Sequence, residues 1–178
     1  MNFKFESPSG EKTIKLLQDE ESEIFLSDTL SGSRNFELHI FLDGNNAKVY
    51  IRGILTTQKS DKKEWKIFVH CKGSSQTASL DLKGVADGNS FLELSGNGIL
   101  TKNSKEGAVT LREKVVLLSP NATVKALPIL RVETENVAEA SHSASITPFD
   151  EEMYFYLESR GINREEGKKL LLDGFLKY

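Results

Sequence analysis

Among the side chains of this sequence that could bind a transition metal, His142 is the most distinctive. It lies between two serines, just after the apolar stretch 137–140. A neutral imidazole can bind iron or handle a proton near pH 7; alternatively, His142 caps the end of a strand. Glu133, Glu135 and Glu139 precede it and could add oxygen ligands. Carboxylates alone select hard ions, however, and an exposed acidic rim explains these glutamates equally well.

The single cysteine, Cys71, is expected to be a structural residue. It ends a row of alternating apolar residues that begins at Trp65, which is typical of a strand with one buried face. One cysteine excludes an internal disulfide framework and any site built from several thiolates of this chain. The other two histidines, His39 and His70, alternate with apolar neighbours and are predicted to face away from the core, in solvent.

Composition and charge exclude several classes of protein. The chain has 178 residues, of which 38% are hydrophobic and 28% charged, with a mean hydropathy of -0.35. These values are typical of a globular protein of one domain, without a membrane span. A net charge of -3 and a pI of about 5.7 argue against nucleic-acid binding. No apolar core follows the first lysine, so we expect no secretory signal and a cytoplasmic location.

Missing motifs narrow the choice further. The sequence contains no Gly-x-x-x-x-Gly-Lys-Ser/Thr loop, so a partner would have to bind any ATP. It also lacks a Gly-x-Ser-x-Gly elbow and a His-Glu-x-x-His helix, which predicts that the chain is not an enzyme of these types. The lysine runs 59–63 and 168–169 are short and mixed with acids, so they are predicted to be ordinary solvated surface.

From about residue 24 to residue 146, apolar and polar residues alternate with period two, as in strands that bury one face. Short apolar runs alternate with turn-forming segments. The runs are 36–42, 47–51, 65–71, 78–82, 91–94, 108–111, 115–118, 122–126, 129–132 and 137–140, and the turns are 43–46, 72–75, 86–89 and 95–98. This spacing suits a sandwich, a barrel or a solenoid. Two features favour a solenoid. Two-residue hairpin turns are few, and small residues recur where corners are expected: Gly53, Gly73, Gly84, Gly96 and Gly98.

The end of the chain changes character, so we divide it into a β core, residues 1–146, and a helical subdomain, residues 147–178. Thr147 is predicted to cap the first helix, with Pro148 at its first position and the acidic residues 150–152 at its positive end.

Arg160 and Gly161 are predicted to end this helix, and Asn163 to cap a second one. The two helices have more apolar residues than one stripe requires. They must therefore pack against the β core, against a partner, or against both.

Residues 117–162 contain a specific series of short motifs. In chain order these are Leu117-Leu118-Ser119-Pro120, Leu127-Pro128-Ile129-Leu130, Ser141-His142-Ser143-Ala144-Ser145, Asp150-Glu151-Glu152 and Ser159-Arg160-Gly161-Ile162. The series resembles the SufB/SufD family of iron–sulfur cluster assembly proteins. The segment 82–88, Leu-Lys-Gly-Val-Ala-Asp-Gly, is similar to the β-helix of that family in a looser way. The resemblance thus covers most of the chain.

This resemblance implies a right-handed parallel β-helix followed by a small helical subdomain. Members of the family pair through their β-helices and present the helices to SufC, an ABC-type ATPase. The resemblance also implies that His142 lies at a subunit interface, where a partner's thiolates could complete a transient iron–sulfur cluster, with no cofactor stably bound. The residues that it implies for ATPase docking are Tyr154, Phe155, Leu157, Arg160, Gly161 and Phe175.

The chain departs from the family pattern in length and in its site residues. It has less than half the usual length. The scaffold cysteine that SufB-type members carry on an earlier strand would fall near Lys114, and the residue after the histidine, often glutamate in that type, is Ser143. We therefore expect a SufD-like, non-catalytic component that pairs with a SufB-type partner or with a second copy.

Two alternatives remain open at this point. The first is a structural adaptor that keeps the fold but has no cluster role. The second is a β-helix enzyme acting on polysaccharides, although Asp81 and Asp87 share no evident register with another acid.

Overall fold

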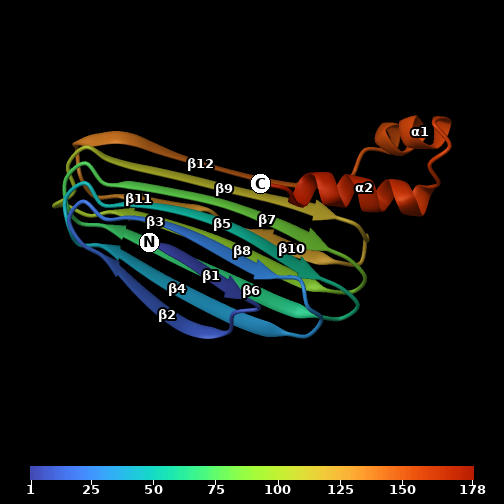
Figure 1. Cartoon of the computed structure of the whole chain (residues 1–178), viewed down its shortest axis with the longest axis horizontal. Coiled ribbons are helices and arrows are strands. Elements are labelled where there is room, and N and C mark those ends of the chain that lie inside the picture. The colour runs from blue at the N-terminus through green and yellow to red at the C-terminus, as the bar shows by residue number, and fades with distance from the viewer.

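Alternating side chains give each long strand one apolar face, and these faces meet inside a parallel β-solenoid of about five turns (Figure 1). The computed structural model describes all of residues 1–178, and strands make up 57% of them. The prediction of a mainly β solenoid with two C-terminal helices is confirmed.

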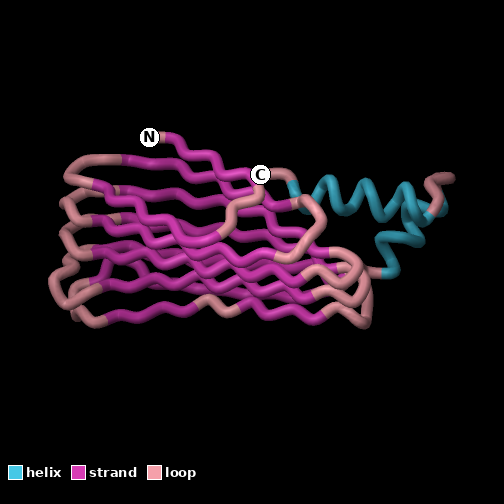
Figure 2. Tube along the Cα trace, turned by 90° about the horizontal axis from the view of Figure 1, so that it is seen from below, coloured by secondary structure: helices cyan, strands magenta, loops and turns pink.

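The chain passes back and forth between two parallel sheets. Sheet A contains, in spatial order, β1 (Asn2–Glu6), β3 (Glu21–Asp28), β5 (Lys48–Thr57), β7 (Thr77–Ala86), β9 (Gly107–Leu117) and β12 (Val137–Thr147). Sheet B contains β10 (Thr123–Ala126), β8 (Phe91–Leu100), β6 (Lys62–Cys71), β4 (Arg34–Leu42) and β2 (Gly10–Leu16), and β11 (Ile129–Val132) also pairs with β8. The helices α1 (Glu151–Ser159) and α2 (Arg164–Leu176) project beyond one end of the strands (Figure 2).

The core consists of inward rows in which each side chain lies on its counterpart in the next coil. One such row in sheet A joins Ile24, Ile51, Leu80 and Leu111, and each of these is at most 1% exposed. The next member of this row is His142, on the last strand of the sheet. The fold therefore places His142 on the face that forms the core in every earlier coil.

The corners of the coils use polar residues, and the prediction that five glycines occupy them is wrong for four. A stacked corner repeats at four residues with positive φ: Asp19, Asn46, Ser75 and Glu106. They are spaced 27, 29 and 31 residues apart, and each backbone N–H donates to the following coil. The uneven coil length explains why the sequence shows no clean repeat.

Of the five glycines only Gly73 lies in a turn, whereas the other four lie inside strands. They leave room for large side chains within the core. A Cβ on Gly53 would lie 2.8 Å from Leu82 Cδ2 and 2.9 Å from Trp65 Cζ3. A Cβ on Gly98 would lie 2.5 Å from Val109. These glycines are packing residues of a flat interior.

Several strand boundaries differ from those predicted. Residues 95–98, predicted as a turn, belong to β8, and the runs 108–111 and 115–118 are joined in one strand, β9. The strands β1 and β2 lie before residue 24, where the sequence was not assigned to strands. Strand β12 is longer than its apolar run because its second half is small and polar and lacks the apolar signal.

Lys63 was predicted to be solvated and is instead fully buried. Its ammonium donates to Asp28 Oδ1 at 2.9 Å and to the carbonyl of Leu30 at 2.6 Å, and Arg34 also bonds Asp28. Two cations thus surround one buried carboxylate at a corner. Such burial is tolerated only because each charge has partners.

The start of the first helix also differs from the prediction. Its N-cap is Asp150, whose side chain accepts a hydrogen bond from the Glu152 amide, so Thr147 and Pro148 lie outside the helix. The remaining predictions for the caps are confirmed, since Arg160 is the C-cap, Gly161 has a φ of 81° and the Asn163 side chain caps α2.

Filling the space at Gly53 should destabilise the fold. We expect Gly53→Ala to lower the free energy of unfolding by about 1–3 kcal/mol, because the new methyl group overlaps the Trp65 ring. Urea denaturation followed by circular dichroism measures the change. The matched control is Gly174→Ala in α2, where no atom lies within 4 Å, and a gain of about 0.5–1 kcal/mol is expected. An unchanged midpoint for Gly53→Ala would contradict the packing role.

Candidate functional site

His142 lies at the open end of the solenoid interior. It pairs in register with Leu111 and belongs to the inward row of sheet A, yet it is exposed because no further coil lies on it. Its Nδ1 lies 3.1 Å from the carbonyl oxygen of Pro128. A carbonyl only accepts, so Nδ1 carries the proton in this bond, and Nε2 of the neutral ring holds the lone pair. Nε2 is thus the ring atom able to bind a metal ion.

Pro128 provides this carbonyl from the opposite wall. Leu127 and Pro128 interrupt the last strand of sheet B, between β10, which pairs with β8 at Leu94, and β11, which pairs from Asn97. Proline has no N–H to give to a ladder, so the strand pairing breaks here.

Glu113 lies inside the same coil and is a site residue that the sequence analysis missed. It is 1% exposed, and its Oε1 accepts a hydrogen bond of 2.6 Å from the Gly96 amide. Its Oε2 has no hydrogen-bond partner. Burial raises the pKa of Glu113 to about 7, although the amides of Gly96 and Leu127 act in the opposite direction. The sequence did contain a signal for the burial of Glu113. In the alternating pattern of this strand, Glu113 stands where its neighbours Leu111 and Val115 are apolar.

Strand β12 itself is an unprotected edge. Ten of its eleven residues are exposed, and the register irregularity between Val137 and Glu139 is confined to its start. It is the outermost strand of sheet A, with β9 on one side only (Figure 1). A long edge that carries one charge, Glu139, and no proline is open to pairing with another strand.

Lys114 and His142 occupy opposite faces of sheet A. Lys114 pairs with Ser145 on the outer face and lines a cleft of about 460 Å³ with Met153 and Phe175 of the helices. The position expected for a scaffold cysteine therefore does not meet His142 within this chain. The two positions can contribute to a common site only around the edge of β12.

The remaining metal-ligand candidates are not brought together. Glu133 pairs with Arg131 at 2.9 Å, Glu139 faces outward beside Thr110, and Glu135 follows the end of β11. No group of three histidine, cysteine or acidic side chains is placed to hold a metal ion. Cys71 is 0% exposed, and burial raises the pKa of its thiol to about 12, so it is the predicted core thiol.

His39 and His70 face outward as predicted, but they are half-buried in a ring stack. The His39 ring lies 4.7 Å from that of Phe68, and the His70 ring 4.6 Å from that of Phe41. Burial lowers the pKa of His70, with His39 the next contributor. These stacks join neighbouring coils on the outside of sheet B.

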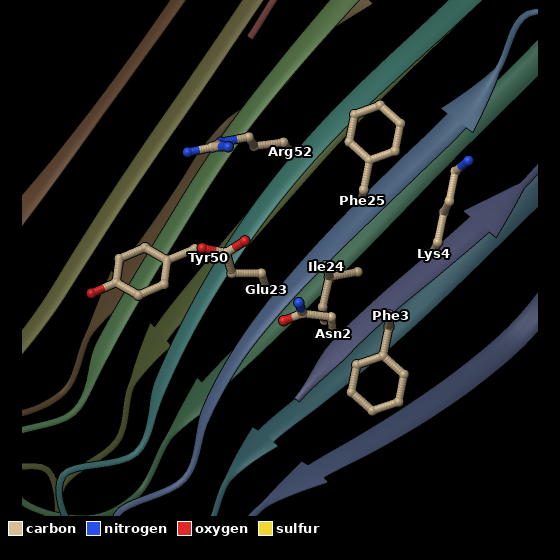
Figure 3. A pocket seen from close by; sticks show the side chains of 8 residues that line it. All are labelled: Asn2, Phe3, Lys4, Glu23, Ile24, Phe25, Tyr50 and Arg52. Carbon is tan, nitrogen blue, oxygen red and sulfur yellow. The ribbon is translucent and has the colours of Figure 1, made fainter.

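A hollow of about 300 Å³ lies at the other end of sheet A (Figure 3). Its side chains come from β1, β3 and β5, with Tyr50, Glu23 and Arg52 on one side and Phe3 and Lys4 on the other. One carboxylate among these groups supplies no acid–base pair. Glycoside hydrolysis uses two carboxylates, so the hollow gives no support to a polysaccharide-acting enzyme.

The outer row that contains Asp81 leads to the same conclusion. Asp81 lies in register between Arg52 and Arg112, with no second acid in the row. Asp87 is bonded to Lys168 of α2 at 3.0 Å.

The two helices fold around one buried aromatic residue. Tyr154 is 8% exposed, packs against Gly167, and has the Arg164 guanidinium 4.3 Å from its ring centroid. Leu157 also contacts Gly167. Of the docking candidates, Tyr154 and Leu157 therefore support the helix pair itself.

The other docking candidates differ in exposure. Phe155 is 74% exposed, and Gly161 is also exposed. The Arg160 guanidinium lies over the Tyr156 ring. Phe175 is half-buried, with its ring centroid 5.8 Å from the Lys83 ammonium. Three further large side chains are exposed on these helices: Met153, Tyr156 and Leu170. Apolar surface that neither helix buries is therefore concentrated at this end of the molecule.

Few contacts hold the helices on the solenoid. The Tyr178 hydroxyl lies 2.8 Å from the Gly53 carbonyl and 2.6 Å from that of Asp81, and the Lys83 ammonium lies 4.2 Å from its ring centroid. Both figures show the chain returning to the strands after α2 (Figures 1 and 2). Neither helix has the length and hydropathy needed to cross a membrane.

The structure is thus a parallel β-solenoid with an open last coil, an exposed edge strand and a projecting helix pair. The family described as "SUF system FeS cluster assembly, SufBD core domain" matches residues 10–175. The chain therefore belongs to the SufBD family of the iron–sulfur cluster assembly system, which confirms the resemblance seen in the sequence.

Curated relatives carry the same family name. The chain is 26% identical over 151 residues to the iron–sulfur cluster assembly protein SufD of Plasmodium berghei, covering 84% of this chain and 11% of that protein. It is 28% identical over 160 residues to a SufBD family protein of Pyrococcus horikoshii (86% and 34%) and 27% identical over 139 residues to one of Galdieria sulphuraria (76% and 61%). The chain spans less than two thirds of the length of each of these relatives.

The buried carboxyl should make stability depend on pH. The pKa of Glu113 is about 7 in the folded chain against its ordinary value of 4.5, so in the unfolded chain this carboxyl loses its proton first as the pH rises. Stability is then fully present below pH 4.5 and falls by ~3 kcal/mol as the pH rises to about 7. We expect Glu113→Gln, which keeps the bond to Gly96, to remove this loss.

Urea midpoints between pH 4.5 and pH 8, in the presence of a chelator, test the effect. The matched control is Glu11→Gln, since Glu11 is exposed on β2. Parallel pH profiles for the wild type and Glu113→Gln would show that Glu113 is already ionised in the fold.

Proposed function

We propose that this chain is a SufD-like, non-catalytic component of an iron–sulfur cluster assembly complex. It pairs through the β12 edge and docks an ABC-type ATPase through its C-terminal helices. The observation that carries the proposal is the exposed β12 edge with His142 at its middle. The cluster is cargo on this proposal, and this chain supplies an imidazole while a partner supplies thiolates.

Pairing along β12 would extend sheet A across two chains. Every second residue of the strand directs its backbone N–H and C=O away from β9, where they have no strand partner, and a second strand would satisfy these groups. The charges suit an antiparallel arrangement, because Glu139 lies near the start of β12 while Arg112 and Lys114 flank Ser143 and Ser145 toward its end. Antiparallel strands bring the acidic start of one edge to the basic end of the other.

Pairing would also bring the two faces of the edge together. His142 faces the interior and Lys114 the exterior of one chain. Where a SufB-type partner carries a cysteine at the position of Lys114, the edge-to-edge contact brings that thiolate to the edge that carries His142. A thiolate and an imidazole are both ligands of iron–sulfur clusters.

The helix pair supports the ATPase part of the proposal. Phe155, Tyr156, Met153 and Leu170 are each at least 50% exposed, although the pair packs around Tyr154 without them. Aromatic and aliphatic groups presented on short helices are the anchors that a hydrophobic groove accepts. This chain has no nucleotide-binding loop of its own, so ATP would be bound by the partner.

A charge at the centre of β12 should prevent pairing. We expect Ser143→Lys to weaken self-association at least tenfold, because like charges face each other across a twofold axis, and an equimolar mixture with Ser143→Glu to restore it. Light scattering after size exclusion measures the mass, with the chain alone and with a SufB-type protein of its own source. Ser79→Lys, on the outer face of the central strand β7, is the control. A wild-type chain that stays monomeric both alone and in the presence of the SufB-type protein would contradict pairing through β12.

A charge on α1 should abolish ATPase docking. We expect Phe155→Glu to weaken binding to the SufC-type ATPase of the same source at least tenfold, measured by calorimetry, because the aromatic anchor is lost. Leu30→Glu is the matched control, since Leu30 is 62% exposed and belongs to the solenoid, in the turn after β3. If Phe155→Glu and the wild type bind the ATPase with equal affinity, the docking surface does not include Phe155. If the wild type does not bind the ATPase, the chain is a structural adaptor instead.

A further inference from the structure

Two side chains that can bind a metal ion reach the same point of the opposite wall in the last coil. Glu113 bonds the amide of Gly96 and lies beside the amide of Leu127, while His142 bonds the carbonyl of Pro128. Leu127 and Pro128 are consecutive, and they lie opposite Ser95 and Gly96 of β8. The carboxyl and the imidazole therefore enter one small region from neighbouring strands.

The register of sheet A agrees with this proximity. Glu113 pairs with Ala144, which is two residues from His142 on the same face of β12. Strands of a sheet lie about 4.8 Å apart and two residues span about 6.6 Å along a strand, so the two Cα atoms are roughly 8 Å apart, within reach of long side chains. Ala144, which is in register with Glu113, carries only a methyl group, and Glu113 itself is 1% exposed.

Each of the two groups has one atom left to bind. Glu113 Oε1 is fixed by the Gly96 amide, while its Oε2 is buried and has no partner. A buried carboxylate oxygen without a partner is costly, so its presence requires an explanation. His142 Nδ1 is held by Pro128, so Nε2 has the free lone pair.

Gly96 shows that the region is shaped around the carboxyl. A Cβ at this position would lie 3.2 Å from Glu113 Oε1 and 3.3 Å from Leu80 Cδ2. The glycine allows its amide to approach the carboxyl at 2.6 Å, which fixes Oε1 and leaves Oε2 buried without a hydrogen-bond partner.

We propose that the open end of the solenoid binds one divalent transition-metal ion between Glu113 Oε2 and His142 Nε2, with water completing the coordination. This inference rests on the proposed function, in which the same end handles cluster cargo, and it gives that end a second cargo, a single metal ion. One carboxylate oxygen and one imidazole nitrogen suit Fe²⁺, Co²⁺, Mn²⁺ or Zn²⁺, and no thiolate is needed. On binding, the carboxyl releases its proton to solvent and its oxygen forms the bond to the metal ion.

Titration of the full chain with Co²⁺ tests the site, because Co²⁺ gives visible absorption bands and shifts the NMR signals of a bound imidazole. We expect one Co²⁺ per chain and shifted imidazole signals that are absent in His142→Ala. Glu113→Gln should weaken binding at least tenfold while the chain stays folded, because the amide keeps the bond to Gly96. Glu139→Gln is the matched control, since Glu139 lies on β12 but faces outward, and it should bind as the wild type does.

Absence of Co²⁺ binding by the wild type would overturn the proposal, as would equal affinities for the wild type and Glu113→Gln. Loss of binding in Glu139→Gln alone would move the site to the outer face and would also overturn it. The isolated chain provides both ligands, so these results are separate from pairing and ATPase docking. A chain that binds Co²⁺ but no protein partner would retain the metal site and lose the proposed function.

Discussion

An inward row of a parallel solenoid is buried only where a further coil lies on it. Ile51, Leu80 and Leu111 satisfy this condition and are at most 1% exposed, whereas His142, the next member of their row, does not. Burial of apolar surface stabilises each earlier coil, at roughly 25 cal/mol per Å². The last coil lacks that cover: its inward positions hold Ala140, His142 and Ala144, and the apolar Ile146 is 43% exposed. Candidate function is therefore confined to the place where this condition fails.

The same condition applies to the backbone and to the helices. Strand β12 has a hydrogen-bonded neighbour on one side only, and α1 and α2 are too small to form a core of their own. The helices project beyond the solenoid (Figure 2). They pack around Tyr154 and leave apolar groups exposed. An open edge and an uncovered helix face at one end are thus features of this member of the SufBD family of the iron–sulfur cluster assembly system. Both features are surfaces that a second protein can complete.

Two ionisable side chains inside the solenoid, Lys63 and Glu113, differ in whether a group of opposite charge accompanies them. Lys63 is fully buried, but its ammonium meets Asp28 and two backbone carbonyls, so the charge is neutralised within the corner. Glu113 is equally buried, but it meets only the backbone amides of Gly96 and Leu127 and no cation. Desolvation favours its neutral form, as its raised pKa reflects. The paired group is structural, whereas the unpaired group lies beside the only inward histidine of sheet A.

The sequence by itself determined the strand-rich core, the burial of Cys71, the caps at Gly161 and Asn163 and the family motifs around His142, because these depend on local periodicity and short-range chemistry. It could also have placed Glu113 and Lys63 inside, since both stand in the phase of apolar neighbours. Only the tertiary structure decided that Gly53 faces Trp65, that Tyr154 is buried, and that His142 and Glu113 converge on the segment Leu127–Pro128. Periodicity fixes which side chains share a face, but the partners across the interior depend on coil lengths that vary from turn to turn.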